Sequence, residues 1–313
     1  MRKRIHIIIP CHNESENVPQ VIRQIDQYMG GLGYDYEFTL IDDGSTDPTF
    51  EQIMALSKAR ENVNAIKLSR KFGKEAALKS GIDVCDADAA ILIDADLQHP
   101  PYLIPSLISE WERGAHIVDA IKIRRQKESF LRRSMAVLFY KIINGLTHMD
   151  FSGASDYKLL DRKAIDILKT LNEKDRFLRG LTNWIGLQHC RIEFRVEERK
   201  SGESKWSWTN LFRLSSDALI SYTSKPLYIV MILGIGTLLF SVVLGAQTLY
   251  NKIYGNAVSG FTTVILIILI TASFIMMSLG IIGLYLSKVY DEVKDRPVYI
   301  VEQYKKSNQA KAS

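Results

Sequence analysis

The chain has 313 residues, of which 47% are hydrophobic and 24% charged, and its formal net charge is +5. This length is enough for one sizeable α/β domain and a second element. The three cysteines, Cys11, Cys85 and Cys190, are odd in number and lack metal-ligand spacing, which excludes a disulfide framework and favours buried thiols in a reducing compartment. The positive charge fits a protein that lies against an anionic membrane leaflet.

The first part of the sequence alternates apolar runs with amphipathic ones. Short apolar runs bounded by turn residues predict buried strands, and the segments between them have the period of amphipathic helices. The predicted strands are Arg4–Ile9, Tyr36–Ile41, Asn64–Leu68 and the run that begins at Ala89; the predicted helices are Val18–Met29, one that Pro48 opens, and one that includes Ala76–Ile82. This alternation predicts a parallel sheet with helices on both faces.

A polar loop follows each predicted strand. In parallel α/β sheets, ligands bind beyond the carboxyl ends of the strands, where the strand order reverses. If the strand order is three-two-one-four, the loop Pro10–Glu14 faces Asp94–Gln98. The sequence has no Gly-x-Gly-x-x-Gly or Gly-Lys-Ser/Thr loop, which excludes the usual nicotinamide-dehydrogenase and P-loop signatures.

Two carboxylates close the fourth apolar run. Side chains two apart in a strand share a face, so Asp94 and Asp96 are expected to point the same way at the carboxyl end of the strand, and Gln98 can follow them. Two carboxylates so close repel each other unless a cation lies between them, and Mg2+ or Mn2+ prefers oxygen ligands that it shares with substrate phosphates. The pair therefore predicts a divalent metal site. The alternative is a solvated turn after a strand.

Amphipathic segments follow the fourth strand. His116–Ile123 predicts a fifth strand. The segment Phe130–Leu146 combines basic residues at its start with apolar ones, and it suits either a membrane surface or an ordinary packed helix. A later helix, Trp206–Tyr222, is expected to lie in the membrane interface.

Two long runs near the C-terminus, Leu227–Leu249 and Phe261–Ser287, contain no charged residue. Each exceeds the roughly 20 residues that a helix needs to cross a bilayer, so the sequence predicts two transmembrane helices instead of a long core helix. The connection between them carries only Lys252, whereas the outer flanks carry several lysines and an arginine. By the positive-inside rule, both termini and the first domain are expected in the cytoplasm, at the plasma (inner) membrane.

The two ends of the chain have simpler predictions. The first residues lead straight into a strand, so no signal peptide is expected. Arg296–Gln303 predicts a short strand, and Tyr304–Ser313 is expected to be a polar tail.

Four ordered motifs resemble those of a known family. Pro10–Glu14, Asp42–Asp47, Ser69–Lys74 and Asp94–Gln98 resemble the successive motifs of glycosyltransferase family 2. With the paired apolar helices, the chain is most similar to the polyprenyl-phosphate branch of that family, over nearly its whole length. The resemblance implies a GT-A (Rossmann-like) α/β fold with a mostly parallel sheet, and inverting transfer of a sugar from a nucleotide-sugar donor.

The resemblance also implies roles on the donor side. The residues expected at the nucleotide sugar are Pro10, Asn13, Glu14, Asp43, Ser45, Arg70, Lys74, Asp94 and Asp96, and those expected around the metal are Asp94, Asp96 and Gln98. Arg70 or Lys74 would pair with the diphosphate. Competing interpretations are a first-turn carboxylate for Glu14, a helix cap for Asp47 and a solvated basic turn for Lys71.

On the acceptor side, Gly153–Arg162 resembles the family's Gly-x-x-Asp-Phe-x-Leu segment, which makes Asp156 the implied catalytic residue beside Asp96. Without the resemblance, Asp156 reads as a turn residue before a strand. The segment Arg176–Gly180 matches a helix that lines the sugar side. The residues expected to bind the acceptor phosphate are Arg125, Arg132, Arg133, Arg199 and Lys205, of which the last two belong to a basic stretch that resembles a mobile closing loop or is a surface charge run.

These features predict a cytoplasmic GT-A domain over 1–205, an interfacial helix over 206–225, two transmembrane helices over 226–288 and a cytoplasmic tail over 289–313. The expected reaction moves glucose or N-acetylglucosamine from a UDP-sugar to undecaprenyl phosphate for cell-envelope glycan modification. The expected cofactor is Mg2+ or Mn2+, no nucleic acid is expected as a partner, and the family allows a homo-oligomer.

The nucleophile in this reaction is a phosphate monoester, whose second pKa is about 6, so it is largely deprotonated at neutral pH. Asp156 is therefore expected to position the acceptor or the sugar more than to take a proton. Two alternatives stay open. A processive polysaccharide synthase is one, although the sequence has no Gln-x-x-Arg-Trp signature, and a non-catalytic membrane scaffold is the other, although Asp94 and Asp96 argue against it.

Overall fold

The structure is a computed structural model that describes residues 2–123, 156–174, 176–195, 225–254 and 260–307. The chain forms two units. One comprises Met1–Lys205 with Pro297–Ser313, and the other comprises Trp206–Arg296. The predicted segments Phe130–Leu146 and Trp206–Tyr222 lie outside the described residues.

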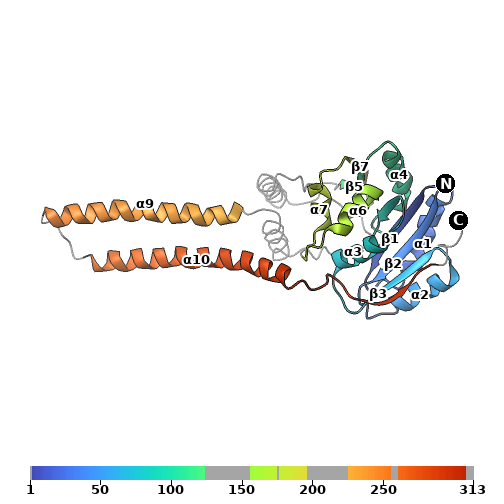
Figure 1. Ribbon diagram of the computed structural model, residues 1–313, viewed down its shortest axis with the longest axis horizontal. Coiled ribbons are helices and arrows are strands. Elements are labelled where there is room, and N and C mark those ends of the chain that lie inside the picture. The colour runs from blue at the N-terminus through green and yellow to red at the C-terminus, as the bar shows by residue number, and fades with distance from the viewer. Residues whose placement is uncertain (1, 124–155, 175, 196–224, 255–259, 308–313) are drawn as a thin grey trace. The chain divides into compact units, whose positions relative to one another are not determined.

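An eight-stranded sheet forms the centre of the first unit (Figure 1). Its order is β7-β5-β6-β4-β1-β2-β3-β8. The strands are β1 Arg4–Cys11, β2 Asp35–Asp42, β3 Val63–Leu68, β4 Ala89–Leu92, β5 Ile117–Ile123, β6 Lys158–Asp161, β7 His189–Arg195 and β8 Val301–Lys305. Strands β4, β1, β2 and β3 run parallel in the predicted order, and β6 and β8 pair antiparallel with their neighbours. The GT-A-like fold with a mostly parallel sheet is therefore confirmed.

Helices cover both faces of the sheet because the central strands are apolar on both sides. Ile5, Ile7 and Ile9 of β1 pack into one buried cluster and Ile8 into another, as the two-residue period of a strand requires. The first cluster includes residues of α1, α2 and α4, and the second includes residues of α3, α6 and α7. The helices are α1 Val18–Met29, α2 Thr49–Ala59, α3 Lys74–Val84, α4 Ile104–Glu112, α6 Arg162–Thr170 and α7 Leu178–Trp184, with a short 3-10 turn over Pro101–Leu103.

The fourth strand is shorter than predicted, since it was expected to extend to Asp94 and Asp96. β4 ends at Leu92, so Asp94 and Asp96 lie in a turn and not on one face of a strand. The turn is held locally, because the Asp96 carboxylate accepts a hydrogen bond from Gln98 N (3.1 Å) and Leu97 has a positive φ of 60°. The prediction that a strand aligns the two carboxylates is wrong, although both carboxylates line the same cavity.

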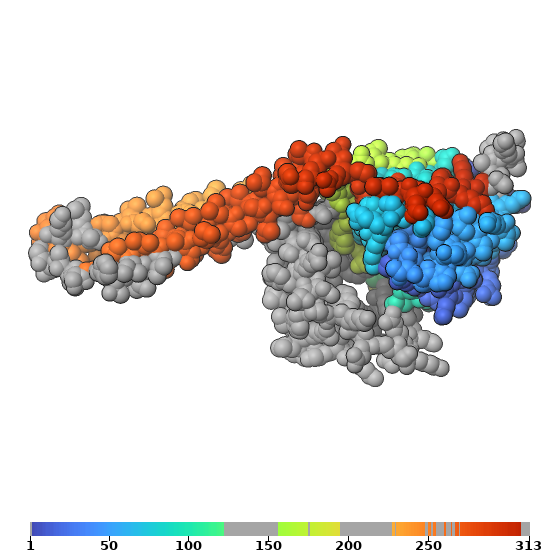
Figure 2. Space-filling model, turned by 90° about the horizontal axis from the view of Figure 1, so that it is seen from below, coloured from blue at the N-terminus to red at the C-terminus, as the bar shows by residue number. Residues whose placement is uncertain are grey.

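The C-terminal strand also differs from its prediction. It begins at Val301 and includes Tyr304 and Lys305, which were expected in the polar tail. Without β8, the backbone N–H and C=O groups of β3 would be unpaired at the edge of the sheet. β8 pairs with them in an antiparallel direction. Lys305 Nζ also donates to Ser57 O (2.7 Å). In Figure 2 this red segment lies on the surface of the first unit beside the blue N-terminal elements.

The second unit contains two long apolar helices that lie side by side (Figures 1 and 2). α9 spans Lys225–Ile253 and α10 spans Phe261–Val293. Windows within them, Val230–Gln247 and Ile270–Val293, are long and apolar enough to cross a membrane. α10 continues past the predicted end of its apolar run, because nothing in the sequence after Ser287 breaks a helix before Val293.

One glycine is needed where two loops of the first unit meet. Gly44 has a φ of +61°, and a Cβ placed on it would lie 2.4 Å from Lys71 N. We expect Gly44→Ala to lower the thermal midpoint, because it adds this clash to the roughly 1–2 kcal/mol that a left-handed residue with a Cβ costs. Gly33→Ala is the matched control, since Gly33 also has a positive φ but nothing within 4 Å. Equal loss of stability in the two variants would contradict the close approach of the loops.

Candidate active site

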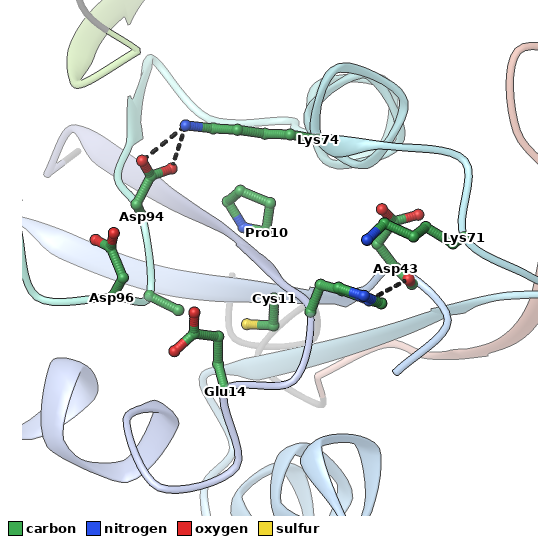
Figure 3. A pocket seen from close by; sticks show the side chains of 10 residues that line it. Pro10, Cys11, Glu14, Asp43, Lys71, Lys74, Asp94 and Asp96 are labelled. Carbon is green, nitrogen blue, oxygen red and sulfur yellow. Dashed lines mark hydrogen bonds and ion pairs between the residues drawn. The ribbon is translucent and has the colours of Figure 1, made fainter. Parts of the chain in front are cut away.

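A cavity of about 250 Å3 opens beyond the carboxyl ends of β1, β2 and β4, where the strand order reverses (Figure 3). Figure 3 shows Glu14, Asp94 and Asp96 at one end of the cavity and Asp43 with Lys71 at the other. The lining residues are Pro10, Cys11, His12, Glu14, Asp43, Lys71, Lys74, Asp94, Ala95 and Asp96. The cavity is therefore lined by the end of β1 and by polar loops that follow the buried strands of the sheet.

The loops that follow β1 and β2 are joined by side chains. Asn13 has a positive φ of 58°, its backbone N donates to Ser45 Oγ (3.0 Å), and its side-chain oxygen accepts from Thr46 N (2.9 Å). Glu14 N donates to Thr49 Oγ1 (2.8 Å). The structure thus places Asn13 and Ser45 against each other, where they fix the rim of the cavity, and only Glu14 of these residues lines it.

Asp43 anchors the loop that follows β3. Its buried carboxylate accepts hydrogen bonds from Phe72 N (2.7 Å) and Gly73 N (2.9 Å). These bonds hold the segment that leads into α3. Within this segment Lys71 lines the cavity, whereas the Arg70 guanidinium lies over the Phe72 ring, 4.0 Å from its centre. Lys71 is therefore better placed than Arg70 to meet an anion in the cavity.

Lys74, the first residue of α3, connects two carboxylates that are far apart in sequence. Its Nζ lies 2.6 Å from Asp94 Oδ1 and 2.8 Å from Asp156 Oδ2. Arg179 of α7 holds Asp156 from another direction, because its Nε and Nη2 donate to the two carboxylate oxygens at 2.7 and 2.9 Å. Asp94, Lys74, Asp156 and Arg179 thus form a chain of alternating charge at the edge of the cavity.

The electrostatic state of Asp156 follows from these contacts. Burial alone would raise the pKa of this carboxyl, but the hydrogen bonds and charges of Arg179 and Lys74 outweigh burial and lower the pKa well below its usual range. Asp156 is therefore an ionised carboxylate at neutral pH. A carboxylate with so low a pKa is a weak base and a strong fixed negative charge.

The turn after β4 is held from both sides. Asp94 N donates to His99 Nδ1 (3.1 Å), and the His99 ring stacks on Tyr157, with 5.1 Å between the ring centres. Gln98 donates both its backbone N–H and its side-chain amide to Asp96. The structure therefore places Gln98 as a partner of Asp96 outside the cavity lining, and Asp94 and Asp96 remain as the candidate metal ligands.

The residues fit a hard divalent cation that is shared with a substrate. Within the described ranges, no group of three His, Cys, Asp or Glu side chains could hold a metal ion alone. Two carboxylates are enough when substrate phosphates supply further oxygens, which is how Mg2+ is commonly bound. The Lys74 ammonium shows that the Asp94 carboxylate is placed to hold a positive charge facing the site.

Sequence reasoning found part of this site and missed part. The predicted residues Pro10, Glu14, Asp43, Lys74, Asp94 and Asp96 line one cavity, and Asp156 reaches it through Lys74. The predicted acceptor residues lie outside the described residues: Arg125, Arg132, Arg133, Arg199 and Lys205. The contacts of His99 and Arg179 were not predicted, since each depends on a partner that only the fold brings close. The family resemblance had implied only that the segment Arg176–Gly180 lies on a helix that lines the sugar side.

Such a cavity can hold a nucleoside diphosphate with a cation. The carboxylates at one end suit the cation, and Lys71 and Lys74 suit the negative charge of a diphosphate. The ionised Asp156 beside them can orient a polar substrate or stabilise positive charge that develops on it.

The chain is similar in sequence to known glycosyltransferases over most of its length. The family described as "Glycosyl transferase family 2" matches residues 6–168. An uncharacterized glycosyltransferase of Synechocystis sp. is 35% identical over 303 residues, covering 96% of this chain and 95% of that protein. The SfII prophage-derived bactoprenol glucosyl transferase of Shigella flexneri is 32% identical over 307 residues, covering 97% and 99%.

Among solved structures, glucosyl-3-phosphoglycerate synthase from Mycobacterium tuberculosis, in complex with Mn2+, UDP-glucose and phosphoglyceric acid, has a TM-score of 0.46 and 18% identity. The likeness covers 70% of this chain and 78% of that one.

Proposed function

The chain belongs to glycosyltransferase family 2, and from that premise we propose that it transfers glucose from UDP-glucose to a polyprenyl phosphate. The observation that carries the proposal is the cavity at the strand-order reversal, with Asp94 and Asp96 at one end and Lys74 between Asp94 and Asp156. The glucosyl group and the lipid acceptor are supported by near full-length similarity to a bactoprenol glucosyl transferase. UDP-N-acetylglucosamine is the second donor to test.

The reaction is a single displacement. A phosphate oxygen of the lipid attacks the anomeric carbon of the sugar, a new carbon–oxygen bond forms, and the bond from that carbon to the β-phosphate oxygen of UDP breaks. The bonding electron pair leaves with UDP, and the configuration at the anomeric carbon inverts. The lipid phosphate is largely deprotonated near pH 7, since its second pKa is about 6, so it needs no strong base.

The protein residues prepare the donor for this step. Asp94 and Asp96 would hold the divalent metal, which when bound would neutralise charge on the departing diphosphate. Lys71 and Lys74 lie where they can contact the diphosphate. Asp43 holds the loop that carries Lys71 and leads into α3 at Lys74, through its bonds to Phe72 and Gly73.

Asp156 acts in this proposal as a fixed negative charge. Its low pKa, which Arg179 and Lys74 maintain against the effect of burial, leaves it ionised while the positive charge of an oxocarbenium-like sugar develops. This role, like the expected positioning of a substrate, requires no proton transfer by Asp156.

The apolar helices α9 and α10 would bring the catalytic unit to its lipid substrate. We infer that both cross the inner membrane and that the catalytic unit and both termini are cytoplasmic, with undecaprenyl phosphate as the acceptor. The basic residues Arg125, Arg132, Arg133, Arg199 and Lys205 remain predictions for contact with the acceptor phosphate.

Donor binding tests the metal assignment separately from the acceptor. In calorimetric titration of the detergent-purified chain, UDP-glucose is expected to bind with Mn2+ present and to lose at least about 10-fold in affinity after EDTA, because the diphosphate then faces Asp94 and Asp96 without a counter-charge. Asp96→Asn should show the same loss with Mn2+ present. Asp166→Asn, on the exposed side of α6, is the control and should bind as the wild type does. Equal affinity for UDP-glucose in the wild type with Mn2+, the wild type with EDTA, Asp96→Asn and Asp166→Asn would show that Asp94 and Asp96 do not hold a metal at the donor.

A further inference from the structure

One carboxylate near the site has no place in the proposed chemistry. Glu75 is the second residue of α3 and is partly buried. Its Oε2 accepts a hydrogen bond from the backbone N of Leu178 at 2.9 Å, across 103 residues of sequence. Leu178 is the first residue of α7, and the N-cap residue Phe177 supplies no side-chain cap. A side chain of another helix thus satisfies one of the N–H groups that a helix start leaves open.

The contact joins the two helices that hold Asp156. Glu75 follows Lys74 directly, and Leu178 precedes Arg179 directly. Lys74 and Arg179 are the residues that donate three hydrogen bonds to the two oxygens of the Asp156 carboxylate. The geometry of that carboxylate therefore depends on how the start of α7 lies against the start of α3.

Apolar packing brings the helices together without fixing this detail. Leu178 and Leu181 of α7 pack in the same buried cluster as Ala77 and Leu78 of α3. Such contacts are non-directional, whereas the hydrogen bond from Leu178 N to Glu75 fixes one point and one direction. The start of α3 itself is held independently, because Asp43 binds Gly73 N just before it.

The cost of placing Glu75 here argues that the contact matters. Burial raises the pKa of Glu75, and the nearby negative charge of Asp156 raises it further, against smaller effects of the Leu178 N–H, Arg179 and Lys74. A buried carboxylate in this position costs free energy unless a hydrogen bond offsets that cost, and the Leu178 N–H supplies such a bond. Because Arg179 follows Leu178 directly, the same hydrogen bond fixes the position of Arg179.

We infer that Glu75 is a positioning residue for Asp156. It sets the start of α7 against α3, so that Arg179 and Lys74 meet on the same carboxylate. This inference rests on the proposed transfer reaction for its effect on rate. Its effect on the position of α7 does not depend on that reaction.

The test uses the full chain and two substitutions of Glu75. Glu75→Gln keeps an oxygen acceptor for Leu178 N and should retain at least about a third of wild-type kcat, whereas Glu75→Ala should lower kcat by about 10- to 100-fold, since small misplacements in a site cost this much. The Kd of UDP with Mn2+ should stay within about twofold in both, because Asp43 still holds the loop before α3. Amide hydrogen exchange in the peptide around 176–184 should accelerate in Glu75→Ala and stay near wild type in Glu75→Gln.

A double-mutant cycle with Asp156→Asn separates positioning from general support of the fold. If Glu75 acts through Asp156, then Glu75→Ala should lower kcat less than about twofold when Asp156 is already Asn. An equal loss in both backgrounds, unchanged exchange around 176–184 in Glu75→Ala, or loss of Mn2+-UDP binding in Glu75→Ala would each overturn the inference. Failure of the wild-type chain to make any lipid-linked sugar would overturn the proposed function instead, and the exchange result would still decide whether Glu75 sets the position of α7.

Discussion

Replacement of Asp156 by Asn is expected to lower kcat for sugar transfer by about 100- to 1,000-fold and to leave the Kd of UDP-glucose within a few-fold. The substitution keeps the size of the side chain but removes the negative charge that Lys74 and Arg179 hold in place. Loss of one preorganised electrostatic partner of a transition state typically costs this much in rate. Steady-state kinetics with calorimetric donor binding measures both quantities, and Asp166→Asn on α6 is the matched control.

The pH dependence of the same variant tests which role Asp156 has. Because Arg179 and Lys74 overcome the effect of burial and keep the pKa of Asp156 low, this carboxylate stays ionised throughout the range in which the enzyme can be assayed. An acidic limb in the rate profile should therefore come from the lipid phosphate, near pH 6, and should persist in Asp156→Asn at a lower rate. If the acidic limb disappears in Asp156→Asn while substrate affinities stay unchanged, Asp156 is a proton acceptor and its proposed role as a fixed charge is wrong.

Lys74→Met should have the second large effect, and it should act on both binding and rate. The Lys74 ammonium lies within 2.8 Å of carboxylate oxygens of Asp94 and of Asp156. Without it, two carboxylates at the edge of the cavity lose their shared cation, and the diphosphate loses a positive partner. We expect kcat/KM for UDP-glucose to fall by about 100-fold or more, since charge-assisted hydrogen bonds contribute about 1.5–3 kcal/mol each.

Two further variants make the Lys74 result specific. Lys58→Met removes a charge from the last turn of α2, where its side chain is exposed, and should leave kcat/KM near the wild-type value. Lys74→Arg keeps the charge but replaces a compact ammonium with a planar guanidinium, so it should recover only part of the loss. A Lys74→Met enzyme with normal kcat/KM would show that the contact with Asp94 and Asp156 is not used in catalysis.

The sheet could be predicted from sequence because its strands are local patterns. Ile5, Ile7, Ile8 and Ile9 are buried on both faces of β1, and such runs are typical of parallel strands covered by helices. The order of the first four strands followed from the usual topology of such sheets. β6 could not be placed in this way, since the short Lys158–Asp161 strand inserts antiparallel between β4 and β5.

The lining of the cavity could be predicted for a similar reason. Its residues follow strand ends that meet at one edge of the sheet, so chain order and strand order together bring them close. The predicted alignment of Asp94 and Asp96 on a strand is wrong, because both reach the cavity from a turn held by His99 and Gln98. No strand pattern indicates that turn.

The contacts around Asp156 could not be predicted from local sequence. Lys74 is 82 residues from Asp156, and Glu75 is 103 residues from Leu178. The first pair depends on how α3 lies beside the residues before β6, and the second on how α3 and α7 pack together, which no periodicity in these segments specifies. The family resemblance supplied Asp156 as a candidate, and the structure adds the residues that hold it.

Transfer of labelled glucose from UDP-glucose to undecaprenyl phosphate, measured as label extracted into organic solvent, tests the central claim most directly. The detergent-purified chain with Mn2+ should give a lipid-linked product that releases glucose on mild acid, and the product should be absent with EDTA and in Asp96→Asn. Label in the lipid only from UDP-N-acetylglucosamine would change the sugar and keep the reaction. If no UDP-sugar labels the lipid, although UDP binds with Mn2+, the assignment of a polyprenyl phosphate as acceptor is wrong.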